Sequence, residues 1–179
     1  MPMLKYLSIP IATISLAVAA QLMIQLPEEV SVVPITGQSL AILLIMELML
    51  WRNGLIAVAL YLLLGGLGLP MFADFASGWD VVSGVAMGYF IGFLLAILLF
   101  SRQADKSKAM SKVSLRLLLA TILILLCGWL GLLKFLEPLE AFKKGILPYL
   151  PGALIKMVLA FIIIGLYRRF RGLMRQVEV

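Results

Sequence analysis

The sequence contains no histidine and a single cysteine, Cys127. Without histidine there can be no histidine-ligated haem, no HExxH metalloprotease site and no Ser-His-Asp triad. One cysteine cannot close an internal disulfide, so thiol chemistry gives no indication of the compartment. Because Cys127 sits within an apolar run, we expect a packed core thiol there.

Charged residues are also scarce. Asp, Glu, Lys and Arg make up 13% of the 179 residues, against roughly 25% in soluble domains, while 63% of the residues are hydrophobic. The mean hydropathy is +1.11. This composition predicts an integral membrane protein. The net charge of +6 could suggest nucleic acid, but the basic residues gather at the ends of apolar runs, so we expect no nucleic-acid partner.

The apolar runs predict an all-α fold. A membrane-spanning helix needs about 20 apolar residues, and somewhat fewer when a bundle buries its ends. The chain offers six candidate spans, at about 7–26, 38–50, 54–69, 82–100, 113–133 and 150–170. The second and third are short and separated only by residues 51–53, so we expect a tight helical hairpin, either straight, bent or short of a full span. We predict one membrane domain over residues 1–179.

The first apolar run has an alternative interpretation as a secretory signal. Lys5 is followed by an apolar stretch that ends in small residues at 17–20, as at a signal cleavage site. The run is long for a signal, and five more apolar runs follow it. We therefore expect the first run to be a retained span.

Charge predicts how the bundle is oriented. The basic residues fall at every second connection: Lys5, then Arg52, then Arg102, Lys106, Lys108, Lys112 and Arg116, and finally Arg168, Arg169, Arg171 and Arg175. The alternate connections hold Glu28 and Glu29, then Asp74 and Asp80, then a loop of mixed charge at 134–144. Because basic loops stay in the cytoplasm, we expect both termini there and a multi-pass protein of the inner (plasma) membrane. The same basic groups can contact anionic membrane lipid.

Lys156 is the main candidate for a ligand-binding residue. It lies six residues into the last apolar run, after the breaker Leu150-Pro151-Gly152. At 1.5 Å per residue it would lie about 9 Å below the outer end of its helix. A cation at that depth is costly unless it is paired, and unpaired N–H groups of the first turn add to the same positive field. The ordinary alternative is a lysine that snorkels to the interface.

Two outer loops supply further candidates. Gln38 lies at the start of the second run, where its amide could both donate to and accept from a ligand. Helix capping by Thr36 or Ser39 is the simpler use of that segment. The apolar loop at 68–80 contains the site candidates Phe72, Asp74, Phe75 and Trp79. Its aromatic residues could cover a ligand or lie at the headgroup level.

Glu47 is the one acid inside an apolar run. It lies near the cytoplasmic end, where Arg52 or a basic loop could pair with it, so we expect a structural role and no contact with Lys156. Small residues recur on the first run at four-residue spacing, for example Ser15 and Ala19. Such a face permits close helix contact, within the bundle or with another subunit.

Four segments in order resemble the BioY family, the biotin-specific substrate-binding (S) components of energy-coupling factor (ECF) vitamin transporters. The resemblance covers about residues 30–165. It rests on Val33-Pro34-Ile35-Thr36-Gly37-Gln38-Ser39, on Tyr61-Leu62-Leu63-Leu64-Gly65 with Gly68-Leu69-Pro70-Met71-Phe72-Ala73, on Gly88-Tyr89-Phe90-Ile91-Gly92-Phe93, and on Leu147-Pro148-Tyr149-Leu150-Pro151-Gly152 with Lys156. The second string is the most specific.

The resemblance implies a six-helix protein that captures biotin from outside the cell and docks on a transmembrane coupling subunit driven by two ATPases. It implies ligand contacts by Lys156, Gln38 and Tyr89. It also implies docking through small residues of the first helix, which here are Ala12, Ser15 and Ala19. The chain has no Walker A motif, so ATP hydrolysis would belong to partner subunits and the chain itself is not an enzyme. No cofactor or metal is implied.

Two departures from the family pattern concern the ligand. The family usually has an aspartate where this chain has Ala153, and a Gly-Pro-Thr-Gly-Gly-Tyr string where this chain has residues 84–89. Both changes remove polar groups from the implied site, and a lost acceptor costs about 1–3 kcal/mol. Biotin is the leading ligand, and a related apolar carboxylate such as lipoate is the alternative. An intramembrane lipid-modifying enzyme and a structural subunit without a ligand are the other hypotheses.

Overall fold

The computed structural model describes residues 3–101 and 109–177. Its elements, in chain order, are α1 (Met3–Gln21), β1 (Met23–Ile24), β2 (Ile35–Thr36), α2 (Gln38–Leu48), α3 (Trp51–Gly66), η1 (Ala73–Phe75), α4 (Trp79–Ser83), α5 (Met87–Phe100), α6 (Met110–Leu132), α7 (Pro138–Gly145), η3 (Leu147–Tyr149) and α8 (Leu150–Val177). The expected basic residues Arg102, Lys106 and Lys108 lie outside the described residues. The side chains of Lys5 and Arg175 are likewise not described.

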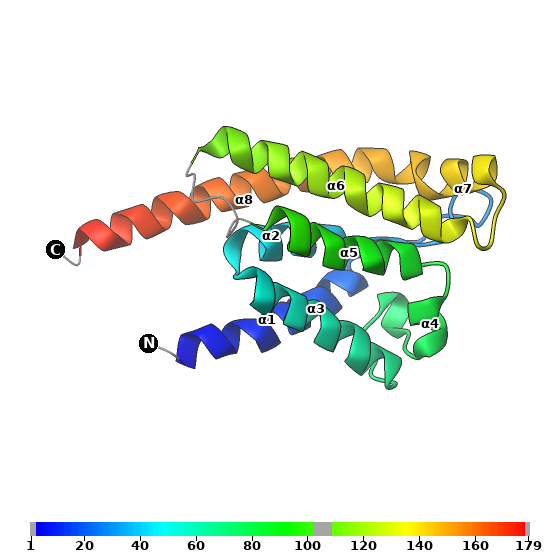
Figure 1. Ribbon diagram of the computed structural model, residues 1–179, viewed down its shortest axis with the longest axis horizontal. Coiled ribbons are helices and arrows are strands. Elements are labelled where there is room, and N and C mark those ends of the chain that lie inside the picture. Colours follow the sequence, from blue (N-terminus) through cyan, green and yellow to red (C-terminus); the bar gives the residue numbers. More distant parts are fainter. Residues whose placement is uncertain (1–2, 102–108, 178–179) are drawn as a thin grey trace.

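The long helices lie side by side in a bundle (Figure 1). Helix α6 packs on α5 and α8. Helix α2 lies between α8 and α1, and α3 packs on α1 and α5. The start of α1, the turn between α2 and α3, and the end of α8 all lie at one end of the bundle. The short elements α4, α7 and η3 gather at the other end.

Each predicted apolar run contains a helix, but two boundaries differ for local reasons. The first helix ends at Gln21 because the chain turns into β1, which pairs antiparallel with β2. The run at 82–100 is divided into α4 and α5, because the chain bends at Gly84. A Cβ there would lie 2.5 Å from the Asp80 carbonyl oxygen, so only glycine fits this bend. Helix α7 lies in a loop for which we predicted no helix.

The expected hairpin of the second and third runs is tight only at its turn. Met49 and Leu50 alone separate α2 from α3. The two helices then diverge, since α2 packs chiefly on α8 and α1 whereas α3 packs chiefly on α1 and α5. They are short, at 11 and 16 residues.

Glycine allows α5 and α6 to pack closely against each other. A Cβ on Gly88 would lie 2.2 Å from the Cys127 carbonyl oxygen, and one on Gly131 would lie 2.6 Å from the Gly88 Cα. Side chains at these positions would push the helices apart. Cys127 lies at this contact and is half-buried, so the thiol is at the edge of the core and not within it as expected.

Glu47 joins three helices at the end of the bundle that holds the start of α1. Its carboxylate, fully buried, pairs with Arg116 of α6 at 2.5 Å and with Arg168 of α8 at 3.2 Å. Arg52 lies instead over the ring of Trp51, 5.2 Å from the ring centroid. The expected structural role of Glu47 therefore has a physical basis, although the partner is not Arg52.

Apolar side chains cover the outside of the bundle. Exposed leucine, isoleucine and valine side chains run along α6 and α8. Among the described residues, two helical stretches are long and apolar enough to cross a membrane, Met110–Leu132 and Pro138–Arg171, and four shorter apolar helices accompany them.

Replacing Glu47 by glutamine should destabilise the protein. The substitution removes the carboxylate shared by two guanidinium groups, and breaking a buried ion pair from one side typically costs about 3–5 kcal/mol. Thermal unfolding in detergent would measure the loss. The control is Glu140→Gln, which breaks an exposed pair with Lys144 and should change stability by less than about 1 kcal/mol. Equal effects of the two substitutions would contradict the structural role of Glu47.

Candidate functional site

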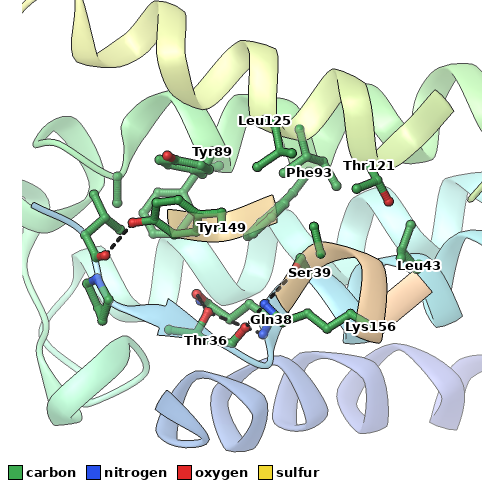
Figure 2. Close-up of a pocket in the computed structure, with 16 residues that line it drawn as sticks. Thr36, Gln38, Ser39, Leu43, Tyr89, Phe93, Thr121, Leu125, Tyr149 and Lys156 are labelled. Atoms are coloured by element: carbon green, nitrogen blue, oxygen red, sulfur yellow. Dashed lines mark hydrogen bonds between the residues drawn. The ribbon is translucent and has the colours of Figure 1, made fainter. Parts of the chain in front are cut away.

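A pocket opens between α2, α5, α6 and α8, next to the segment before α2 (Figure 2). Sixteen residues line it: Val33, Pro34, Thr36, Gln38, Ser39, Leu43, Ala86, Tyr89, Phe90, Phe93, Thr121, Ile124, Leu125, Tyr149, Ala153 and Lys156. They come from segments far apart in the chain, which the bundle brings together near the end that holds α7.

Lys156 is the one charged residue among those that line this pocket. Pro151 occupies the first turn of α8, where a missing N–H leaves no hydrogen bond broken. One turn further on, the Lys156 ammonium donates to the Thr36 carbonyl oxygen at 2.6 Å and to Ser39 Oγ at 3.1 Å. The side chain therefore crosses to the start of α2 and does not snorkel. As expected, Lys156 and Glu47 form no pair.

Gln38 forms a buried polar wall of the pocket. Its amide nitrogen donates to the Tyr61 hydroxyl, and its amide oxygen accepts from Thr36 Oγ1 at 2.8 Å. Both ends of the amide are thus engaged within the protein. The N-cap of α2 is Gly37, which forms no side-chain capping bond. Thr36 Oγ1 nevertheless accepts from the N–H of Gln38, the first residue of α2, at 3.4 Å, so Thr36 helps to cap the helix as expected.

Tyr89 and Tyr149 close the end of the pocket nearest α7, with ring centroids 5.5 Å apart. The Tyr89 hydroxyl donates to the Gly145 carbonyl oxygen at 2.6 Å. The Tyr149 hydroxyl donates to the Val33 carbonyl oxygen and lies 2.8 Å from Ser31 Oγ. Tyr149 was not among the residues predicted for the site, although it lies within the last string that resembles the BioY family.

Apolar side chains form the remaining walls. Leu43 comes from α2, Phe90 and Phe93 from α5, and Ile124 and Leu125 from α6. Such a pocket, apolar except for a few polar groups, binds a small ligand with an apolar body and one polar end.

A second hollow adjoins the first, since both are lined by Val33, Pro34, Thr36, Gln38, Ala86 and Phe90. Two of the predicted loop residues, Phe72 and Asp74, line this second hollow only. Phe72 is buried and packs edge-on against Tyr61, 5.4 Å between ring centroids. It therefore belongs to the core that supports the site.

Phe75 and Trp79, which were predicted for the site, line neither of these two hollows. Their side chains are 68% and 54% exposed. Trp79 packs over Gly66, where a Cβ would lie 3.0 Å from the indole ring. An exposed tryptophan at the end of a helical bundle matches the alternative of a side chain at the headgroup level.

The three small residues predicted for docking have different surroundings. Ala12 is 5% exposed and packs inside the bundle, so it is not available to a partner in this structure. Ala19 is half-buried against Gly37, whose N–H donates to the Ala19 carbonyl oxygen at 2.9 Å. Ser15 is exposed, and its hydroxyl donates to the Ile11 carbonyl oxygen at 2.8 Å.

No group of three or more His, Cys, Asp or Glu side chains in the described part of the chain could hold a metal ion.

The bundle and its pocket define a helical membrane protein with a mostly apolar pocket of the size of a small solute. Comparison with known proteins identifies the family within this class. Residues 3–172 match the BioY family model, and the chain belongs to the BioY family.

Two curated relatives are similar over most of their length. The chain is 29% identical over 139 residues to a probable biotin transporter BioY of Pyrococcus horikoshii, covering 78% of this chain and 83% of the relative. It is 31% identical over 132 residues to the biotin transporter BioY of Thermotoga maritima, covering 73% and 78%.

One solved structure has the same fold. It is the S-component for biotin from an ECF-type ABC transporter, with a TM-score of 0.83 and 22% sequence identity. The match covers 94% of this chain and 92% of the solved one. At that identity the likeness shows the fold.

Replacing Tyr149 by phenylalanine should loosen the segment before β2. The Tyr149 hydroxyl links η3 to Ser31 and Val33 by hydrogen bonds. Without it, the buried oxygen atoms of Ser31 and Val33 lose a hydrogen-bond partner, which costs about 1–3 kcal/mol of folding free energy. Hydrogen–deuterium exchange over residues 31–36 should accelerate about tenfold. The control is Tyr167→Phe on the exposed part of α8, which should leave that segment unchanged. Unaltered exchange in Tyr149→Phe would contradict the role assigned to its hydroxyl.

Proposed function

We propose that this protein is a substrate-binding membrane subunit that captures biotin from outside the cell for uptake by an ECF-type transporter. The observation that supports it most strongly is the pocket itself, which has one ammonium group, Lys156, among apolar and aromatic walls. Biotin has a matching form, with an apolar ring and chain and a polar group at each end. The curated relatives described above are named as biotin transporters.

In this proposal Lys156 binds the polar head of the ligand. Two of its three N–H groups are engaged by Thr36 and Ser39, and the third is left for a ligand oxygen. Phe90 and Phe93 contact the apolar body. Gln38 and Tyr89 hold the polar wall and the closed end of the pocket by their bonds within the protein.

We further propose that the whole chain, residues 1–179, is one membrane domain that crosses the inner membrane six times with both termini in the cytoplasm. Successive long helices alternate in direction along the bundle (Figure 1). Most basic residues of the described part, including Arg116, Arg168 and Arg169, lie toward the end where α1 begins and α8 ends, whereas Lys134, Lys143 and Lys144 lie at the end that holds α7. That end is the cytoplasmic one by the positive-inside rule, and the pocket opens nearer the outer side.

Energy for uptake comes from partner subunits in this proposal. The chain has no Walker A motif, so a coupling subunit and its ATPases would supply ATP hydrolysis. The exposed face of α1 that includes Ser15 is the proposed docking surface. Membrane lipid covers the apolar faces of α6 and α8.

One observation favours lipoate as a second candidate ligand. No carboxylate lines the main pocket, because Ala153 stands where the family usually has an aspartate. A ligand without N–H donors has no need of such an acceptor. By contrast, the intramembrane enzyme lacks support, since a second charged group beside Lys156 is missing from the pocket lining.

The direct test is isothermal titration of the purified protein with biotin and with lipoate. Wild-type protein should bind biotin. Lys156→Met should weaken binding by about 10- to 100-fold, because a hydrogen bond to a charged group contributes about 1.5–3 kcal/mol.

The matched control is Arg169→Met, which removes an exposed cation from the other end of the same helix and should leave binding unchanged. Failure of the wild-type protein to bind biotin, together with failure to rescue biotin-dependent growth, would refute the proposed function. Tighter binding of lipoate than of biotin would change the assigned ligand.

A further inference from the structure

Helix α7, which no sequence pattern predicted, has two sides of different character. Ala141 and Gly145, four residues apart, face the bundle and are buried. A Cβ on Gly145 would lie 2.4 Å from Leu132 Cδ1, so α7 packs closely on the end of α6. Leu139 and Phe142, three residues apart, share another side of the helix, and they are 66% and 40% exposed. In the described part of the chain this second, apolar side of α7 is left open.

The open side of α7 follows a surface of the same character on α6. Exposed apolar side chains recur there every three or four residues, and so lie along one side of the helix: Leu119, Ile122, Leu126, Leu130 and Leu133. In a membrane protein such a surface faces the acyl chains of the lipid. Phe135, in the connection from α6 to α7, is exposed as well. Exposed apolar surface is therefore present on α6, on the connection and on α7.

Trp129 indicates the depth at which α7 begins. The part of α6 from Met110 to Trp129 is about 29 Å long at 1.5 Å per residue, close to the roughly 30 Å of a hydrocarbon core. With the start of α6 at one membrane surface, Trp129 reaches the other, where tryptophan is enriched. Its indole N–H donates to the Pro138 carbonyl oxygen at 3.3 Å. Pro138 is the first residue of α7, so the helix begins at the level of the lipid headgroups.

The charges on α7 suit a layer of lipid phosphates. Lys144 pairs with Glu140 at 2.9 Å, and the two charges offset each other. Lys143 is exposed and forms no ion pair with a described residue, so the helix keeps one positive charge beside its apolar side. A lysine in that position lays its aliphatic stem along apolar surface and extends its ammonium toward a phosphate. An apolar side bordered by lysine is typical of helices that lie in the membrane interface.

We propose that α7 is an interfacial helix whose partner is the phospholipid of the outer leaflet. Leu139 and Phe142 enter the boundary between headgroups and acyl chains, and Lys143 contacts a phosphate. The inner side of the same helix holds the closed end of the pocket, because the Gly145 and Lys144 carbonyl oxygens accept from Tyr89 and Ser31. The lipid layer therefore supports that end of the pocket. The inference does not depend on which ligand the pocket binds.

The test measures the depth of single spin labels in nanodiscs of phosphatidylcholine and phosphatidylglycerol. Labels are placed on Leu139→Cys, Phe142→Cys, Glu140→Cys and Leu130→Cys, each combined with Cys127→Ala. Power saturation by oxygen and by a water-soluble nickel chelate then reports the depth of each label. Labels at 139 and 142 should lie about 5–10 Å into the boundary between headgroups and acyl chains. The label at 140 should be in water, and the label at 130 should lie in the acyl chains.

A charge reversal tests the phosphate contact. Lys143→Glu brings a carboxylate to the phosphate layer, so the label at 142 should move toward water, whereas Lys143→Arg should leave its depth unchanged. All substituted side chains of α7 are exposed, and thermal unfolding of each labelled variant in detergent would confirm that the bundle is intact. An unaltered depth in Lys143→Glu would refute the phosphate contact.

Two other results would overturn the interfacial position itself. Labels at 139 and 142 that are as accessible to the nickel chelate as the label at 140 would place the whole helix in water. Labels protected from both oxygen and the chelate would show that protein, such as a second copy of the chain, covers this side instead of lipid. Biotin titration of the same nanodiscs is a separate measurement, so failure of the proposed function and failure of this inference are distinguishable.

Discussion

The hydrogen bonds from Lys156 to the start of α2 are the interaction on which the site depends. A cation inside an apolar helix must find acceptors or leave the membrane interior. Here the acceptors are a backbone carbonyl at the end of β2 and a hydroxyl in the first turn of α2. The bonds therefore fix the last helix against a segment more than a hundred residues earlier in the chain, and they set the polar end of the pocket.

Each end of the bundle holds charged side chains inside the protein, and the partners of these charges differ between the two ends. At one end Glu47 pairs with arginines of two helices in a buried cluster that keeps one net positive charge. At the other, Lys156 has only neutral partners, so part of its charge is available to a ligand. The short strands, α7 and η3 surround this second end, and the tyrosine hydroxyls bind them to one another. We infer that ligand capture occurs at the end where the cation has only neutral partners and lines a pocket.

Sequence patterns predicted the helices and singled out Lys156 as a candidate for the site, because both follow from local chemistry. Long apolar runs must form helices in a membrane, and Lys156 stands out in such a run. The partners of Lys156 could not be predicted in this way. Ser39 resembles an ordinary residue at a helix start, and only the packing of α8 on α2 brings its hydroxyl to the ammonium. The resemblance to a family indicated Tyr89 as a ligand contact, and Tyr89 lines the pocket.

The outcomes for other candidate residues also have physical reasons. Phe75 and Trp79 were predicted either to cover a ligand or to lie at the headgroup level, and the structure leaves both side chains exposed, with Trp79 packed on Gly66. Ala12 lies on the face of α1 that packs inward, and four-residue spacing cannot distinguish that face from an exposed one.

The central claim is that Lys156 and its partners hold the polar head of a ligand, and the structure of the protein bound to biotin tests it most directly. We predict ligand oxygen within hydrogen-bond distance of Lys156 Nζ and the apolar rings against Phe90 and Phe93. Biotin bound elsewhere, with the Lys156 ammonium making no contact to it, would contradict the account.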